Sequence, residues 1–293
     1  MSRIPDSAIP TGRFAPSPTG PVHQGTLAAA LASYLDVKVD DGQWLLRIDD
    51  IDQPREVPGA ADQLLSFLEK SGFEWHGPVV RQTACIDTYH EYLEQLKRQQ
   101  LTFACTCSRK QLSQSDRYPG TCRNNAGRHI KAPHAIRMLT DDARIRFVDR
   151  VYGLQTQDVQ LQVGDFVVFR KDGLFAYQFA VVIDDAIAGI NRVTRGKDLL
   201  DSTPRQILLQ QKLNLATPLY AHIPLIYDQQ GQKLSKSSPN ATALKPDLAA
   251  LTKVWNHLQP INVSTADFDT IDGFWKWARQ HWQTQLIRDM HYD

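Results

Sequence analysis

Two short stretches, far apart in the chain, carry residue types that suit phosphate chemistry. Residues 18–26 (PTGPVHQGT) contain His23, a side-chain donor, and Gly25, which lets a flat base approach the backbone. If a helix begins here, its N-terminal N–H groups favour a phosphate. Residues 229–238 (QQGQKLSKSS) carry Lys233 and Lys236, which can meet phosphoryl oxygens that gain charge. Taken singly, a proline-ordered turn with a capping histidine explains the first stretch equally well, and a solvated basic loop explains the second better.

A second kind of chemistry is indicated by Cys105, Cys107 and Cys122, which crowd a polar, loop-like stretch. Four cysteines in 293 residues are too few for a disulfide scaffold. Three neighbouring thiolates suit Zn²⁺, which takes a fourth ligand to complete a tetrahedron. The candidates for that position are Tyr118, His129 and His134, and ligand statistics alone favour a histidine. The alternative is a set of free cysteines in a reducing cytoplasm.

The elements around the first stretch alternate between strand and helix. The pattern predicts a helix over residues 26–38, a strand over 44–48, a helix near 59–71 and a helix over 87–100. Gly72 follows the second helix in the position of a C′ glycine, and Asp87 is suited to cap the third. This βαβα order, which follows the segment around Arg13, predicts a parallel sheet.

The middle of the chain has a different character. Residues 105–131 show little hydrophobic periodicity and resemble a loop that needs outside support. Residues 144–148 and 159–163 alternate like half-exposed antiparallel strands. We therefore expect an insertion over residues 105–170. Helix and strand patterns return at residues 177–185, 191–194 and 203–213.

Composition excludes several classes of protein. The chain has 42% hydrophobic and 22% charged residues, and its 33 Lys+Arg against 32 Asp+Glu give a net charge of +1. These proportions are those of a globular protein, and a nucleic-acid partner would need a local basic surface. No apolar stretch approaches the roughly 20 residues that span a bilayer, and the N-terminus does not resemble a signal peptide. We expect a cytoplasmic monomer without a membrane partner.

Together, the two stretches resemble the two signatures of class I aminoacyl-tRNA synthetases. The resemblance narrows to the catalytic domain of glutamyl-tRNA synthetase, because five further motifs agree in order between about residue 11 and residue 240. These motifs are residues 13–20 (RFAPSPTG), 46–52 (LRIDDID), 176–185 (AYQFAVVIDD), 193–196 (VTRG) and 200–206 (LDSTPRQ).

The end of the chain indicates a subtype. A full glutamyl-tRNA synthetase carries a large helical anticodon-binding region after its lysine-containing loop, whereas only a short region follows it here. Residues 55–62 (REVPGAAD) also look like the truncated paralogues, the glutamyl-Q tRNA(Asp) synthetases. That resemblance implies activation of L-glutamate with ATP and Mg²⁺, and transfer to the queuosine base in the anticodon of tRNA(Asp). Because an anticodon-binding region is not expected here, we also expect activation to proceed without tRNA. The alternatives are a conventional glutamyl-tRNA synthetase with a shortened C-terminus and an inactive tRNA-binding paralogue.

The resemblance also implies a fold and its divisions. The expected class is α/β, a doubly wound, Rossmann-like parallel sheet with a zinc-containing α+β insertion and a short helical C-terminus. Residues 1–104 and 171–240 would form the two halves of the nucleotide-binding domain, 105–170 the insertion, and 241–293 a C-terminal region without an anticodon-binding domain. A basic surface for the tRNA is expected on the insertion, from Arg109, Lys110, Arg117, Arg123 and Arg128.

Residue roles carry over position by position. Glutamate binding is implied for Arg13, Phe14, Ala15, Pro16, Ser17, Asp49, Tyr177 and Arg195. ATP binding is implied for His23, Gly25, Lys233 and Lys236, with His23 and Lys236 catalytic. One structural Zn²⁺ is implied for Cys105, Cys107, Tyr118 and Cys122, because residues 118–122 resemble the family's Tyr-x-x-x-Cys. Two positions depart from the pattern: Asp49 stands where the family usually has Glu, and Thr26, able to cap the helix, stands where many class I enzymes have His.

Overall fold

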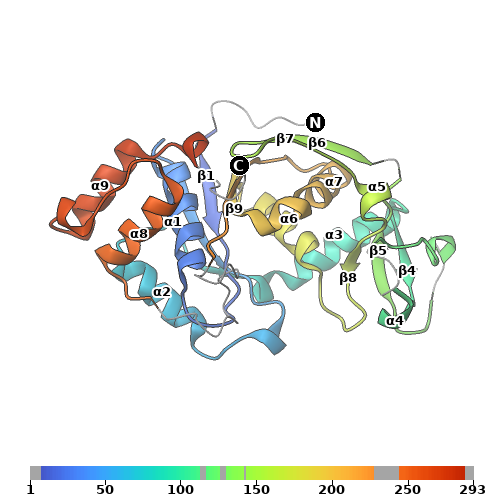
Figure 1. The fold of residues 1–293 in the computed structure, drawn as a ribbon. Helices are drawn as coiled ribbons and strands as arrows, with labels where there is room; N and C mark the ends of the chain where they lie inside the picture. Colours follow the sequence, from blue (N-terminus) through green and yellow to red (C-terminus); the bar gives the residue numbers. More distant parts are fainter. Residues whose placement is uncertain (1–7, 113–116, 126–129, 142, 228–243, 288–293) are drawn as a thin grey trace.

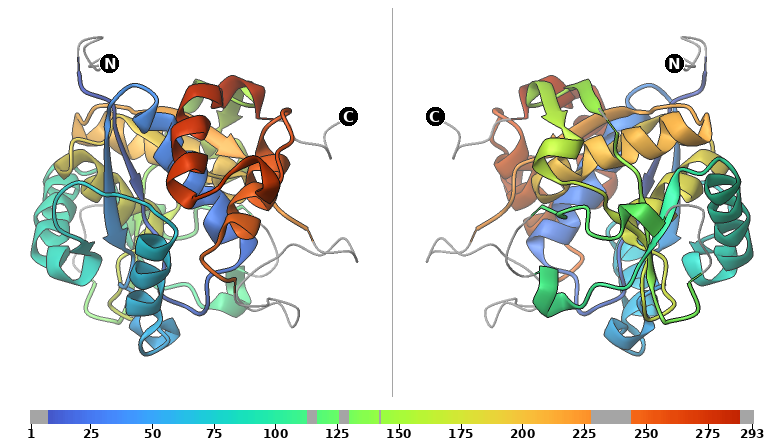
Figure 2. Two further views of the ribbon diagram at one scale, coloured as in Figure 1. Left: turned by 90° about the vertical axis from the view of Figure 1, so that its left-hand side faces the viewer. Right: turned by 90° about the vertical axis from the view of Figure 1, so that its right-hand side faces the viewer.

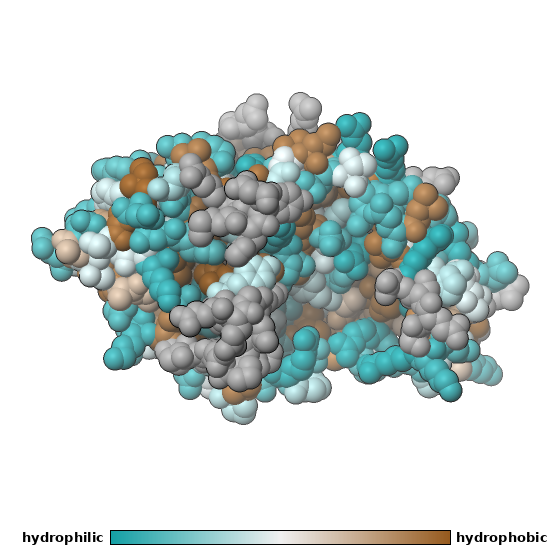
Figure 3. Space-filling view, in the orientation of Figure 1, coloured by the Kyte–Doolittle hydropathy of each residue, from teal (hydrophilic) through white to brown (hydrophobic). Residues whose placement is uncertain are grey.

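The computed structural model describes residues 8–112, 117–125, 130–141, 143–227 and 244–287. Figure 1 shows a central sheet with helices on both of its sides. The face seen in that orientation is predominantly hydrophilic, with small and separate hydrophobic areas (Figure 3). Within the described ranges, no helix combines the length and the apolar character needed to cross a membrane.

The central sheet has seven strands in the order β3-β2-β1-β9-β10-β6-β7. They are β1 (Thr11–Phe14), β2 (Gln43–Ile48), β3 (Val80–Arg81), β6 (Arg144–Asp149), β7 (Gly153–Asp158), β9 (Arg192–Gly196) and β10 (Leu219–Ile223). Neighbouring strands are parallel except β6 and β7, which form an antiparallel hairpin. The chain runs from β1 toward β2 on one side, and β9 pairs with β1 on the other. Such a reversal opens a crevice at the carboxyl ends of the strands.

Two hydrophobic cores cover the two sides of this sheet (Figure 1). The helices of the first are α1 (Gln24–Lys38), α2 (Ala60–Lys70), α8 (Leu248–Leu258) and α9 (Ile271–His281), and those of the second are α3 (Ile86–Arg98), α6 (Tyr177–Ile187) and α7 (Thr203–Leu213). In the first core the Tyr34 ring meets the rings of Trp44 and Trp275 edge-on, with centroids 5.2 and 4.9 Å away. The C-terminal helices thus pack directly on α1.

The expected C′ glycine after α2 is confirmed. Gly72 has φ +78°, a left-handed conformation that costs glycine little. A Cβ atom here would lie 2.8 Å from both Ile271 and Trp275, so the position also lets α9 approach. Nearby, the Trp275 indole donates to the Ser71 carbonyl over 2.8 Å.

The middle of the chain contributes to two sheets. β4 (Thr102–Cys105), β5 (Ala135–Met138) and β8 (Val167–Phe169) form a separate antiparallel sheet next to the short helix α4 (Arg109–Leu112). Figure 2 shows this region on the flank opposite α8 and α9. The pairing begins at Thr102, before the expected division at residues 104 and 105. β6 and β7 instead extend the central sheet, so the middle of the chain also contributes to the second core.

Three local predictions are wrong. Residues 159–163 form a short helix, α5 (Val159–Gln162), because Asp158 accepts a hydrogen bond from the Leu161 N–H and caps it. Asp87 does not cap α3: a 3₁₀ turn (Gln82–Cys85) runs straight into the helix, and Asp87 falls in its first turn. Thr26 does not cap α1, because the helix begins two residues earlier and His23 is its N-cap.

Candidate active site

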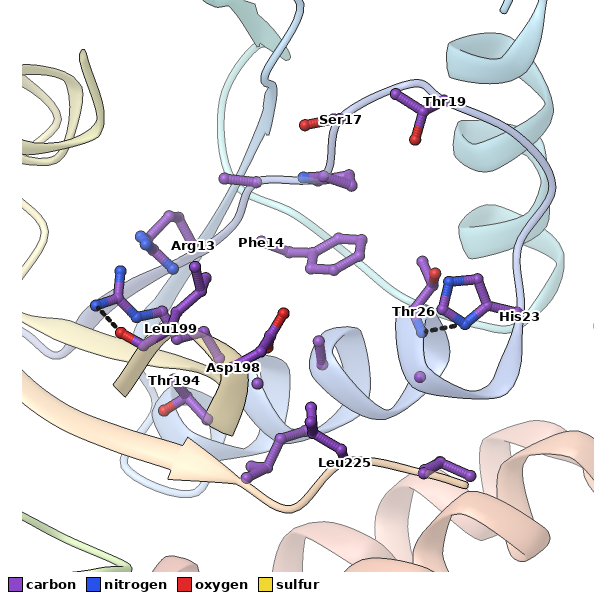
Figure 4. Close-up of a pocket in the computed structure, with 18 of the residues that line it drawn as sticks. Arg13, Phe14, Ser17, Thr19, His23, Thr26, Thr194, Asp198, Leu199 and Leu225 are labelled. Carbon is purple, nitrogen blue, oxygen red and sulfur yellow. Dashed lines mark hydrogen bonds between the residues drawn. The ribbon is translucent and has the colours of Figure 1, made fainter. Parts of the chain in front are cut away.

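A cavity of about 780 Å³ opens at the carboxyl ends of β1, β9 and β10, beside the first turn of α1. Most of the site residues predicted from sequence line it: Arg13, Phe14, Ala15, Pro16, Ser17, His23, Gly25, Tyr177 and Arg195. Arg55, Thr194 and Asp198 line it as well and were not predicted. Figure 4 shows Arg13 on one side, His23 and Thr26 on the other, and the Phe14 ring between them. Lys233 and Lys236 lie outside the described residues.

His23 holds the start of α1 at the cavity. Its Nδ1 accepts a hydrogen bond from the Thr26 N–H over 3.4 Å (Figure 4). In a neutral imidazole this leaves the proton on Nε2, which is then a donor. The cap therefore selects the tautomer that can donate to a phosphate oxygen, so the capping role and the expected chemical role are compatible.

Arg13 is anchored by one buried carboxylate, which belongs to a cluster of charges. Its Nε donates to both oxygens of Asp185 at 3.0 Å, and Arg47 donates to Asp185 over 2.7 Å and to Asp49 over 2.7 Å. Asp184 lies 3.5 Å from Arg47. Burial raises the pKa of Asp185, but the charges of Arg13 and Arg47 outweigh it and lower the pKa overall. Asp185 is thus an anion clamped between two cations.

Asp184 behaves differently from its neighbour. Tyr89 and Gln82 each donate to it over 2.6 Å. Burial raises the pKa of Asp184 to about 6, because the charge of Arg47 compensates only in part. Two arginines cannot neutralise three carboxylates in one buried cluster, and the pKa is raised at two of the three, Asp184 and Asp49.

The structure does not bring Asp49 to the wall of the cavity. Its side chain is buried and bonded to Arg47, and it is missing from the described residues that line the opening. Burial raises the pKa of Asp49, and the charge of Arg47 opposes this shift. The Asp49 N–H donates to the carbonyl of Pro16, which does line the cavity. The shorter side chain therefore lies directly behind the wall.

Arg195 is anchored by mostly neutral groups. Its Nε donates to Nε2 of His222 over 3.0 Å, and its Nη2 donates to the Thr203 hydroxyl over 2.8 Å. Its Nη1 lies 3.5 Å from the hydroxyl of Tyr177, a residue that is 37% exposed at the start of α6. His222 in turn contacts Asp149 over 2.6 Å. Burial lowers the pKa of His222, although the bond to Asp149 opposes this shift.

Sequence reasoning missed the supporting groups behind both arginines. Arg47, Asp184 and Asp185 lie within motifs that resemble the glutamyl enzymes, so that resemblance was a signal for them. For Asp149 and His222 the sequence offers little: one ends a strand assigned to the insertion, and the other is a lone histidine in a strand. Only their hydrogen bonds distinguish them from ordinary core residues.

The three clustered cysteines do come together. Their sulfur atoms all lie within 4.8 Å of one another, and those of Cys107 and Cys122 are 3.5 Å apart. Zn–S bonds of about 2.3 Å in a tetrahedron place sulfurs roughly 3.8 Å apart, so this spacing fits a zinc ion. The Tyr118 hydroxyl lies 3.6 Å from the Cys105 sulfur and accepts the Cys122 N–H over 2.9 Å.

The protonation of these groups also bears on metal binding. Burial raises the pKa of Cys107 to about 11, whereas hydrogen bonds from Thr106 and Cys107 overcome burial and lower that of Cys122 to about 7. The Tyr118 hydroxyl has its pKa raised, first by burial and then by Cys105. Among the histidine alternatives, His134 is half-buried and contacts the Ala132 carbonyl, outside the cysteine group. His129 lies outside the described residues.

The chain is similar in sequence and fold to proteins that are already known. Residues 11–246 match the family described as tRNA synthetases class I (E and Q), catalytic domain. The glutamyl-Q tRNA(Asp) synthetase of Pseudomonas fluorescens is 48% identical over 281 residues, covering 94% of this chain and 93% of the relative. The protein of the same name from Dechloromonas aromatica is 47% identical over 290 residues, covering 94% and 95%.

Solved structures show the same fold. The glutamate tRNA ligase from Elizabethkingia meningosepticum, in complex with its amino acid, has a TM-score of 0.78 at 26% identity, covering 96% of this chain and 66% of that one. The glutamate-tRNA synthetase from Elizabethkingia anophelis has a TM-score of 0.79 at 24% identity, covering 96% and 67%. The chain thus spans about two thirds of these structures. It belongs to the class I tRNA synthetases of the glutamate and glutamine type, which are ligases, and within them to the family of the glutamyl-Q tRNA(Asp) synthetases.

Proposed function

We propose that this enzyme activates L-glutamate with ATP, without tRNA, and transfers the glutamyl group to the queuosine base in the anticodon of tRNA(Asp). The observation that carries the proposal is the single cavity that collects Arg13, Arg195 and His23 from three elements. Its volume suits an amino acid joined to a nucleotide. The names of the relatives support the choice of substrate.

In this proposal the two arginines bind the two carboxylates of glutamate. Arginine presents a rigid, permanently charged fork that matches a carboxylate, and both arginines are already oriented by buried partners. Tyr177 supplies an apolar wall and a hydroxyl, and the segment 14–17 closes one side. Asp49 contacts the substrate ammonium through water, because its carboxylate lies behind the wall on Arg47.

Activation needs no protein nucleophile. An α-carboxylate oxygen of glutamate attacks the α-phosphorus of ATP, and the bond to the leaving pyrophosphate breaks. His23 donates to a phosphoryl oxygen from Nε2, while Gly25 admits the nucleotide next to the backbone. Lys233 and Lys236, by resemblance, meet the charge on the pyrophosphate, with Lys236 the principal cation. Mg²⁺ accompanies ATP and offsets phosphate charge.

The second step consumes the glutamyl-adenylate. A hydroxyl of queuosine attacks the glutamyl carbonyl carbon, and AMP leaves with the electron pair of the broken bond. The segment 105–131 would be ordered by Zn²⁺ on Cys105, Cys107, Tyr118 and Cys122, with no open coordination position. The role of the zinc ion is therefore structural, and the arginines of segment 105–131 serve the tRNA.

The first test is glutamate-dependent exchange of pyrophosphate into ATP, with no tRNA added. We expect exchange with glutamate and none with aspartate. Absence of exchange would favour an inactive tRNA-binding protein, and exchange that appears only after tRNA is added would favour a conventional glutamyl-tRNA synthetase. The second test follows labelled glutamate on tRNA(Asp) with and without queuosine. Label that survives removal of the terminal adenosine supports the base as acceptor, and label lost with that adenosine contradicts it.

A separate test addresses the metal. We expect wild-type protein and His129→Ala to contain one zinc each by elemental analysis, and Tyr118→Phe to contain less. Loss of zinc from segment 105–131 should impair transfer to tRNA more than exchange. Zinc retained in Tyr118→Phe but lost in His129→Ala would replace the tyrosine by a histidine ligand.

A further inference from the structure

The contact between Arg195 and His222 constrains the imidazole. A guanidinium never loses its protons in proteins, so the Nε of Arg195 is always a donor. His222 Nε2, 3.0 Å away, must therefore be an acceptor and carry no proton. The proton of a neutral His222 then belongs on Nδ1, and a doubly protonated imidazole would set two donors against each other.

Asp149 imposes the same arrangement from the opposite side of the ring. Its Oδ1 accepts three backbone N–H groups, from Val151 at 3.0 Å, Tyr152 at 2.9 Å and His222 at 3.3 Å. These donors fix which oxygen faces inward. Oδ2 is left to accept the Nδ1–H of His222 over 2.6 Å. Both side chains in this pair have no exposed surface.

Asp149 and His222 meet where β6, from the middle of the chain, pairs with β10 of the central sheet. Asp149 ends β6, and His222 lies in β10 with Tyr220 opposite Asp149 in the parallel pairing. Thr203, at the start of α7, accepts from Arg195 and lies 3.2 Å from His222 Nε2. Arg195 itself lies in β9 and lines the cavity. Asp149, in the middle of the chain, is thus linked to the cavity residue Arg195 by the imidazole of His222.

We propose that His222 and Asp149 are positioning residues that hold Arg195 at the substrate: Asp149 locks His222 in its Nδ1–H tautomer, so that Nε2 can accept from Arg195. The inference deepens the proposed function, on which it rests, because it assumes that Arg195 binds a carboxylate of glutamate. Neither residue lines the cavity among the described residues, so both act through Arg195.

Asp149→Asn is a selective test because it barely changes shape. The three backbone donors should keep the amide oxygen in the place of Oδ1. The amide nitrogen then faces His222 and donates to Nδ1, which moves the proton to Nε2 and directs it at Arg195. We expect the Michaelis constant for glutamate in pyrophosphate exchange to rise about tenfold or more, with a smaller change in kcat.

The tautomer itself is a readout that does not depend on activity. Long-range ¹H–¹⁵N spectra of imidazole-labelled protein should place the His222 proton on Nδ1 in the wild type and on Nε2 in Asp149→Asn. Asp165→Asn is the matched control, since Asp165 is a buried carboxylate that accepts from Thr140 and Arg123 just outside the strands of the separate sheet. It should leave both the His222 tautomer and the Michaelis constant unchanged.

Two substitutions at His222 test the acceptor if Asp149→Asn does not fold. His222→Asn keeps a donor for Asp149 but offers no acceptor to Arg195, whereas His222→Gln places an amide oxygen near the former Nε2. We expect the Michaelis constant for glutamate to rise about tenfold in His222→Asn and to be largely rescued in His222→Gln. An unchanged Michaelis constant in His222→Asn, or an unchanged tautomer in Asp149→Asn, would overturn the inference. Wild-type protein without any exchange would instead contradict the proposed function.

Discussion

Arg13 and Arg195 reach the same cavity from neighbouring strands, yet the protein holds them by different electrostatic means. Arg13 is bound to Asp185 in a buried cluster of two arginines and three aspartates. Arg195 is bound to the uncharged imidazole of His222, to a hydroxyl and, over a longer distance, to the hydroxyl of Tyr177. Asp149, the nearest acid in this series of hydrogen bonds, contacts His222 and not Arg195 itself.

This difference separates two ways of orienting a permanent cation. A carboxylate attracts the guanidinium strongly, but the cluster then depends on charge balance, and removing one member strands the others in a buried place. A neutral acceptor orients the guanidinium without neutralising it, so more of its charge remains for a substrate anion. In the first arrangement, a change at the site also changes the stability of the fold. In the second, the orientation of the arginine depends on which imidazole nitrogen carries the proton.

The largest expected effect follows from removing the cation at the centre of the charged cluster. Arg47→Met leaves Asp49 without its main partner and Asp185 with only Arg13. We expect the free energy of unfolding, measured in urea, to fall by about 3–5 kcal/mol. Lys276→Met removes the cation of an exposed ion pair with Asp272 and should change it little. Equal effects of the two variants would mean that the cluster is not held by charge.

The next comparison removes each cavity arginine in turn. Arg13→Met and Arg195→Met should each raise the Michaelis constant for glutamate on the order of 10²-fold, because each loses a charged contact with a carboxylate. Only Arg13→Met should also lower the urea midpoint, since it leaves Asp185 short of a cation, whereas Arg195→Met leaves His222 neutral and bonded to Asp149. A comparable loss of stability in both variants would erase the distinction.

The contributions of Asp184 and His222 to the free energy of unfolding should change with pH in opposite directions. The pKa of Asp184 rises from 3.8 to about 6 on folding, so its stabilisation is present below pH 3.8 and is lost as the pH rises to about 6. The lowered pKa of His222 acts the other way, because the unfolded chain binds more protons below pH 6.5. The difference in unfolding free energy between Asp184→Asn and wild type should therefore shift in favour of the variant by roughly 2 kcal/mol across pH 4–6. A flat difference would contradict the charge excess at Asp184.

The smallest expected effect concerns Asp49. Asp49→Glu should leave the carboxylate on Arg47 and extend it toward the cavity wall, with a cost in stability of about 1–3 kcal/mol for one added methylene. We expect the Michaelis constant for glutamate to stay the same or to fall. Isothermal titration would measure the dissociation constant for glutamate, which should likewise stay the same or fall. A large loss of affinity would show that the backbone around Pro16 has adapted to the shorter side chain.

The sequence predicted much of the site because several of its parts are local. His23 and Gly25 lie within three residues of the first turn of α1, and Cys105, Cys107 and Cys122 lie within one loop-like stretch, so residue type and spacing were enough to single them out. The alternation of elements likewise predicted the parallel sheet. Helix starts were harder to predict: a capping histidine at position 23 was only one of two explanations for that stretch, and the alternation of residues 159–163 concealed the short helix that Asp158 caps.

What the sequence by itself determined is therefore the set of chemical groups and the alternation of strands and helices along the chain that carries them. Tertiary structure alone decided how those groups are held. Asp185 lies 138 residues from Arg47 and 172 from Arg13, and Asp149 lies 73 residues from His222. No local spacing links such pairs. They meet because β6 joins the central sheet beside β10 and because α6 packs its acids behind β1, and a buried charge or donor that failed to meet its partner there would cost more than the local fold can supply.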